Sequence, residues 1–190
     1  MCLLGLALCA LTGCLRHTAA PAACPPPPLT FMWSETPTLD QIPASPITGM
    51  INGKPFIVKM VRVDHKLDDL WLDMADAAPA WEAAIPNSKV EVELSIKIPQ
   101  GTASSIVKAL KDPEDATTGH PWYHYKVSGS KNEASKNPPW AGALEIDEWK
   151  MAPPSYAFVT GHLKGKVAIC FNDGAKSWVA GTFDCIEISN

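Results

Sequence analysis

The stretch Val90-Glu91-Val92-Glu93-Leu94-Ser95-Ile96-Lys97-Ile98 alternates apolar and polar residues without interruption. Successive side chains of a β-strand point to opposite faces, so this stretch predicts a strand with one buried face and one face in water. An antiparallel sheet that is packed on one side and solvated on the other accommodates such a strand.

A second strong signal lies further toward the N-terminus, where Asn52-Gly53 separates two apolar runs. Both residues tolerate positive φ, which a two-residue hairpin turn requires. We therefore expect a hairpin between strands at 47–51 and 56–63. Further strands are expected at 67–75, 122–127, 142–151, 156–160, 161–171 and 177–188.

The remaining segments predict connections and two short helices. Residues 104–111 are expected to form a helix that Ser104 or Ser105 caps and Pro113 ends. One helical turn is expected at 79–84, a polar loop at 128–139, and an ordered arm without regular structure at 30–46. The predicted fold class is all-β: an antiparallel sandwich or small barrel of seven to nine strands with one or two short helices.

Composition limits the partners that the chain can have. The formal net charge is −4, whereas nucleic-acid-binding proteins usually carry a basic patch, so we expect no nucleic acid partner. No repeat of fixed period is present, which argues against a solenoid or a propeller. Segment 30–190 is long enough for a single β-rich domain with a sizeable core.

Cys170 and Cys185 flank the turn signal Asp173-Gly174. With a two-residue turn there, Cys170 faces Ser177 and Cys185 faces about His162. In a straight hairpin the two cysteines then lie roughly 27 Å apart at about 3.4 Å per residue. A disulfide needs Cα atoms within about 7 Å, so we predict that these two cysteines are not bonded to each other.

Patterns for metal and cofactor chemistry are weak. His120 and His124 are four residues apart, but Trp122-Tyr123 between them favours a strand, on which they would lie about 13 Å from each other. The acidic stretch does not follow a calcium-loop pattern. It consists of Asp64, Asp68, Asp69, Asp73 and Asp76. We therefore predict no metal site and no cofactor.

Signatures of hydrolysis are incomplete. The pattern S-x-x-K occurs at Ser105 to Lys108 and at Ser128 to Lys131, without the companion patterns S-D-N and K-T-G. Glu145, Asp147 and Glu148 cluster near Trp149, and paired carboxylates are typical of glycosidases. Alternation with Leu144 and Ile146 instead favours the outer face of a strand, so we assign no catalytic residue.

The seven tryptophans suggest binding. Trp122 and Trp140 flank the polar loop, and rings held on a rigid sheet can stack on sugars or contact a protein partner. Trp140 follows Pro138-Pro139, so we expect it to be exposed. Trp149 and Trp178 are expected to fill the core. Trp122 and Trp140 are the predicted binding residues.

The N-terminal region predicts where the protein is held. An apolar run at 3–11 leads into Leu11-Thr12-Gly13-Cys14 and is too short to span a bilayer, which needs about 20 residues. The sequence resembles the lipobox of bacterial lipoproteins. The resemblance implies a signal peptide at 1–13 and acyl chains on Cys14, and Leu15 implies the outer membrane. An ordinary secretory signal is the alternative.

Residues 14–29 are expected to form a tether. Prolines at 21 and 25–28, with alanines between them, exclude a helix or a paired strand. Such a segment favours extended polyproline geometry of about 3.1 Å per residue. Cys24 lies within the tether as either a free thiol or a cross-link to another chain.

These observations favour a lipid-anchored envelope domain that is not an enzyme and that binds an envelope protein or glycan. The alternatives are an envelope hydrolase that uses the carboxylates near Trp149, and a purely structural module. A binding module should present an aromatic patch outside the core, whereas a hydrolase should bring at least two carboxylates together in a pocket.

Overall fold

The computed structural model describes residues 31–66, 69–77, 92–99, 103–112, 120–126, 133–151 and 161–188. The expected signal peptide, the tether, the helical turn at 79–84 and the strand at 156–160 lie outside these residues. Within them the chain is all-β, as predicted, with one short 3-10 helix, η1 (Leu39–Gln41). No helix of this part is long and apolar enough to cross a membrane.

The described residues contain eleven strands, more than the seven to nine predicted. In chain order they are β1 (Thr48–Ile51), β2 (Lys54–Ile57), β3 (Met60–Lys66), β4 (Asp69–Ala75), β5 (Val92–Ile98), β6 (Ser105–Lys108), β7 (Trp122–Lys126), β8 (Glu133–Lys136), β9 (Trp140–Met151), β10 (Gly161–Phe171) and β11 (Trp178–Ile188).

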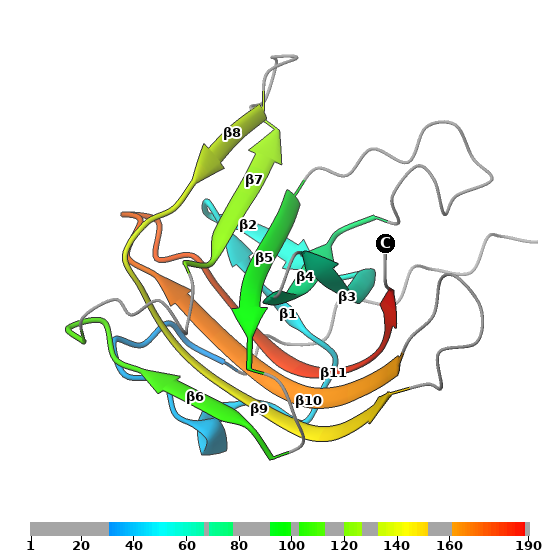
Figure 1. Ribbon diagram of the computed structural model, residues 1–190. Coiled ribbons are helices and arrows are strands. Elements are labelled where there is room, and N and C mark those ends of the chain that lie inside the picture. Colours follow the sequence, from blue (N-terminus) through cyan, green and yellow to red (C-terminus); the bar gives the residue numbers. More distant parts are fainter. Residues whose placement is uncertain are drawn as a thin grey trace, which may run out of the picture.

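The strands form two layers joined at one corner (Figure 1). The first layer has the order β6-β9-β10-β11-β1-β2, and the second has the order β3-β4-β5-β7-β8. Neighbours within each layer run antiparallel, whereas β11 and β3 run parallel and share only the pairs Glu187–Val63 and Ile188–Asp64. The outermost strands β6 and β8 do not pair in the described structure, so the sheet is not closed into a barrel.

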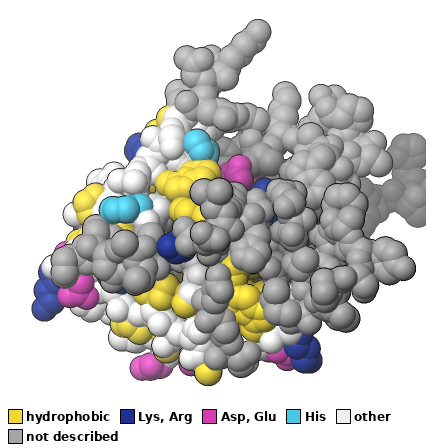
Figure 2. Space-filling model, in the orientation of Figure 1, with side chains coloured by type: hydrophobic (Ala, Val, Ile, Leu, Met, Phe, Trp, Pro, Cys, Tyr) yellow, Lys and Arg dark blue, Asp and Glu magenta, His cyan; other side chains and the backbone are white. Residues whose placement is uncertain are grey.

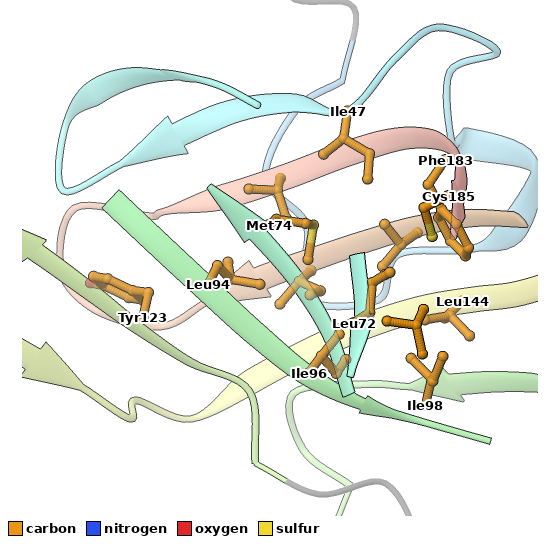
Figure 3. Packing of buried hydrophobic residues seen from close by; sticks show 14 of the residues in the cluster. Ile47, Leu72, Met74, Leu94, Ile96, Ile98, Tyr123, Leu144, Phe183 and Cys185 are labelled. Atoms are coloured by element: carbon orange, nitrogen blue, oxygen red, sulfur yellow. The ribbon is translucent and has the colours of Figure 1, made fainter. Parts of the chain in front are cut away.

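The two layers share one hydrophobic core. Strict alternation on β4 and β5 turns residues such as Leu72 and Leu94 inward, where both are fully buried. Figure 3 shows them in one cluster with Leu144 of β9 and Phe183 of β11. Burial of these side chains from both layers provides the main stabilisation of the fold.

The N-terminal arm, residues 31–46, covers the outer face of the first layer. Its side chains Phe31 and Ile42 belong to a second buried cluster, on the opposite side of the sheet from the main core. The indole Nε1 of Trp33 donates a hydrogen bond to the carbonyl oxygen of Phe171 at 2.8 Å. The expected ordered arm is therefore present, and η1 is its one regular turn among the described residues.

The hairpin predicted at Asn52-Gly53 is confirmed. Both residues have positive φ, at 51° and 75°, and Ile51 pairs with Lys54 across the turn. The expected strand at 56–63 is divided, because β2 pairs with β1 in the first layer while β3 pairs with β4 in the second. The chain changes layer at residues 58 and 59.

The helix predicted at 104–111 is wrong. Residues Ser105–Lys108 form β6, which pairs with β9 so that Ile106 lies opposite Leu144. Pairing with the edge of β9 overrides the local capping signals for a helix. The segment ends in a turn, in which the backbone N–H of Ala109 donates a hydrogen bond to Asp112 Oδ2 at 2.7 Å. The loop predicted at 128–139 likewise contains β8, a polar edge strand paired with β7.

Cys170 and Cys185 are free thiols, so the prediction that they are not bonded is confirmed. The expected register is wrong by one residue, because Cys170 pairs with Trp178 and Cys185 with Leu163. The turn between β10 and β11 is longer than two residues, because the last pair of the β10–β11 ladder before the turn is Cys170–Trp178. Cys170 belongs to the cluster beneath the arm, whereas Cys185 belongs to the main core.

Candidate functional site

A row of polar side chains crosses the second layer in register. Arg62 of β3 lies opposite Asp73 of β4, Asp73 lies opposite Ser95 of β5, and Ser95 lies opposite Trp122 of β7. Their sequence neighbours Leu72 and Leu94 point into the core. Alternation therefore places all four residues of the row on the outer face of the second layer.

Hydrogen bonds and charge hold this row in place. Asp73 and Ser95 are both 0% exposed, and the Ser95 hydroxyl donates to Asp73 Oδ1 at 2.5 Å. Arg62 Nε lies 3.4 Å from Asp73 Oδ2, and the Arg62 side chain is 20% exposed. A buried carboxylate is costly unless it is paired, so these contacts offset the cost of burying Asp73 and fix the geometry of the row.

Aromatic side chains flank the polar row. Trp122 is partly exposed, and its ring lies 4.4 Å from that of His124, centroid to centroid, in an edge-on arrangement. Trp71, two residues before Asp73 on β4, is also partly exposed and lies opposite Lys97. Figure 2 shows histidine beside hydrophobic side chains in the upper part of the molecule, where β7 lies in Figure 1.

This arrangement offers groups that can contact a ligand. A partly exposed indole offers a flat apolar surface, and the partly exposed side chains of Arg62, Glu93 and Lys97 supply donors and acceptors. Asp73 and Ser95 are buried and act by holding Arg62 in place. The described charges on this face balance, because Arg62 and Lys97 accompany Asp73 and Glu93. The face can therefore stack and hydrogen-bond a ligand without a strong preference for charge.

The structure separates the two tryptophans that the sequence grouped together. Trp140 begins β9 and points inward, 1% exposed, so its expected exposure is wrong. Gly142 makes room for the ring, because a Cβ there would lie 2.6 Å from Trp140 Cζ3. Lys108 Nζ donates to the Trp140 carbonyl oxygen at 3.0 Å and lies 5.0 Å from the ring centroid.

The other late tryptophans, Trp149 and Trp178, lie away from the face that carries Trp122. Trp149 is partly buried and packs against the main core. Trp178 is buried in the cluster beneath the arm, where its ring centroid lies 5.3 Å from that of Phe31. The expectation of a buried side chain is confirmed for Trp178, whereas Trp149 is only partly buried, and neither contributes to the face that carries Trp122.

The carboxylates near Trp149 lie on the outer face of the first layer, and two of them pair with different lysines. Glu145 pairs with Lys166 at 2.8 Å, and Glu148 pairs with Lys150 at 2.6 Å. The hydrogen bond from Lys150 is the main cause that lowers the pKa of Glu148. Asp147 is exposed at an irregularity in the β9–β10 ladder. The described contacts therefore do not bring these carboxylates together.

The remaining sequence patterns do not form a site in the described residues. Ser105 and Lys108 are three positions apart on β6, which puts them on opposite faces of a strand. Ser128 lies outside the described residues, as does Asp68. No group of three metal-ligating side chains occurs in the part of the chain that the structure describes.

A second polar cluster, which the sequence did not reveal, ties the two layers together at one end. The Tyr123 hydroxyl of β7 donates to Asp173 Oδ2 at 2.6 Å, and Asp173 also accepts from the Ser177 hydroxyl and from its backbone N–H. Ser177 Oγ in turn accepts from the Asn52 backbone N–H at 2.8 Å. The sequence indicates a turn at Asp173, but it does not indicate the contact with Tyr123, which lies 50 residues away in the chain.

Sequence reasoning found Trp122 of the outer face but missed Arg62 and Ser95, and it treated Asp73 only as part of an acidic run. Comparisons with protein-family models, with curated proteins and with solved structures found no match. The site is therefore interpreted from its own geometry.

Proposed function

We propose that the chain is a lipid-anchored module of the bacterial envelope that binds a glycan through the outer face of the second layer. The observation that supports this most strongly is the row Arg62–Asp73–Ser95–Trp122, in which buried hydrogen bonds orient polar groups beside a partly exposed indole. We also infer that the two layers form a β-sandwich, which holds this face rigid.

A glycan fits this face better than a protein partner does. The centre of a stable protein–protein interface is depleted in charged residues. Here charged groups alternate with rings, and sugar rings combine one apolar surface with hydroxyl groups that need donors and acceptors. The balanced charge of Arg62, Asp73, Glu93 and Lys97 further favours a neutral glycan over a strongly acidic one.

Binding is favoured over hydrolysis because Glu145 and Glu148 near Trp149 are engaged by different lysines. The purely structural alternative is less favoured, because a structural module gains nothing from partly exposed tryptophans beside a buried charged row. The anchor is supported by the lipobox resemblance at residues 11–14, and the tether at 14–29 would present the domain away from the outer membrane.

The binding proposal is tested with the purified full chain against peptidoglycan and a panel of neutral and acidic glycans, by co-sedimentation and calorimetry. Loss of the Trp122 ring in Trp122→Ala should weaken binding about ten-fold, the effect of losing one stacking contact. His162→Ala removes a partly exposed ring from the outer face of the first layer and should bind like the native chain. Equal binding by both variants, or retention of an envelope protein instead of any glycan, would refute the proposal.

The anchor is tested separately by mass spectrometry of protein purified from its native host. Acyl chains on Cys14, and their loss together with release from membranes in Cys14→Ser, are the expected results. A bare Cys14 thiol on full-length material would contradict the anchor without affecting the binding experiment.

A further inference from the structure

The N-terminal arm has a hydrophobic cluster of its own. The cluster beneath it contains Phe31 and Ile42 of the arm, while the main core first includes the chain at Ile47. The first layer separates the two clusters. Removing the arm from its position would therefore expose one outer face without removing a side chain from between the layers.

The sheet surface under the arm is built mainly from small side chains, with Trp178 of β11 as the large exception. Alanines on three adjacent strands line it together with Cys170. These alanines are Ala141, Ala143, Ala168 and Ala180. They form a shallow apolar surface that the larger side chains of the arm cover, so the contact is made by few large groups.

The arm is fastened mainly near its two ends. At the N-terminal end, Trp33 Nε1 donates to the Phe171 carbonyl oxygen at 2.8 Å, and Lys176 Nζ lies 3.6 Å from the Trp33 ring centroid. At the other end, the Thr182 backbone N–H donates to the Ser45 carbonyl oxygen at 2.8 Å. Between them, the described backbone–backbone hydrogen bond from the arm to the rest of the protein runs from Leu110 N–H, in the turn after β6, to Glu35 O, so a continuous ladder to the sheet is not formed.

We propose that the arm is a releasable strap, which leaves the outer face of β9, β10 and β11 as a unit while the two layers stay folded. Segments with few buried contacts and no ladder open at lower free energy than core strands. Release would lengthen the connection that precedes the domain by about 50 Å, at about 3.3 Å for each extended residue. The strap does not depend on the proposed glycan binding.

Two cysteines report separately on the strap and on the core. Cys170 is 0% exposed beneath the arm, and its Sγ accepts from the Ser34 backbone N–H at 3.4 Å. Cys185 is buried between the layers. Burial raises the pKa of Cys170 to about 11 and that of Cys185 to about 12, so both thiols are unreactive while covered. Release of the strap uncovers only Cys170.

The test uses the full chain, labelled with N-ethylmaleimide in native buffer and mapped by mass spectrometry of the peptides that contain each cysteine. Cys170 should react at least about ten-fold faster than Cys185, because it needs only local opening. Trp33→Ala should speed labelling of Cys170 about ten-fold, as expected for losing one hydrogen bond and one cation–π contact, and leave Cys185 unchanged.

Matched variants separate release of the strap from general loosening. Leu144→Ala, which creates a cavity in the main core, should speed labelling of both cysteines alike. Lys176→Ala removes the exposed cation above Trp33, together with its hydrogen bond to Asn172 Oδ1 in the same turn, and replaces Trp33→Ala if that variant does not fold. Equal rates for the two cysteines in the native chain, with the same dependence on denaturant, would overturn the proposal. Equal acceleration of both by Trp33→Ala would do the same.

Discussion

Replacing Tyr123 with phenylalanine removes a hydroxyl that joins the second layer to the β10–β11 turn of the first. Tyr123 is 0% exposed, and its hydroxyl donates to Asp173 Oδ2 at 2.6 Å. A hydrogen bond to a charged group contributes about 1.5–3 kcal/mol, so we expect Tyr123→Phe to lower the free energy of unfolding by about 2 kcal/mol. For a domain of this size that corresponds to a fall in Tm of about 4–8 °C.

The loss should depend on pH in a defined direction. Burial raises the pKa of Asp173, but hydrogen bonds from Ser177 and Tyr123 outweigh it and hold the pKa below the ordinary value of 3.8. A carboxylate with a lowered folded pKa stabilises the fold above its unfolded pKa, and this contribution disappears as the pH falls through the folded pKa. The stability gap between native protein and Tyr123→Phe should therefore narrow in acid.

Urea unfolding monitored by tryptophan fluorescence, at neutral pH and at successively lower pH, measures this gap. Tyr125→Phe is the matched control, because Tyr125 lies on the same strand and its described contacts are made by its ring. We expect it to change stability little. A loss in Tyr123→Phe no larger than in Tyr125→Phe, or a gap that is the same at every pH, would refute the reasoning.

Three further predictions concern the backbone, the core and the surface. Gly181 has φ 148°, and a Cβ there would lie 2.6 Å from Ile47 Cα, so Gly181→Ala should cost about 2–4 kcal/mol in urea unfolding. Gly53→Ala, in open space at the hairpin turn, should lower the free energy of unfolding by only about 1 kcal/mol. Equal losses in the two variants would contradict the close approach of Gly181 to Ile47. Leu72→Ala should lose about 3 kcal/mol, while Val107→Ala at a 60% exposed position should lose almost nothing; comparable losses would contradict the assigned core. Lys150→Ala should raise the pKa of Glu148 toward its ordinary 4.5, and an NMR titration that finds it unmoved would show that the ion pair is absent in solution.

Sequence predicted those parts of the fold that depend on local rules. The alternating stretch that ends in Ile98 became β5, and Asn52-Gly53 became a hairpin with positive φ at both turn residues. It failed where a distant partner decides the structure. Residues 105–108 had helix capping signals, yet they pair with β9, because pairing at that edge satisfies more backbone groups than an isolated turn of helix would.

In the candidate site too, the sequence indicates the local features but not the contacts between distant residues. Alternation on β5 indicates that Ser95 points to the outer face, but only the register of β3, β4 and β5 brings it opposite Asp73 and Asp73 opposite Arg62. Register between separate strands is a tertiary property that one sequence does not disclose. Trp140 was misjudged because Pro138-Pro139 indicates a loop, while the strand that begins immediately afterwards turns the ring inward.

The place of β11 constrains the order in which the protein can assemble. This strand pairs with β10, with β1 and, at its last residues, with β3, and it also anchors the arm at Thr182. Several of the earliest described residues thus depend on the latest ones for their pairing. Before residues 161–188 are synthesised, β1 and β3 lack β11, the strand with which both pair in the finished fold. The polypeptide therefore stays incompletely folded until synthesis is nearly finished.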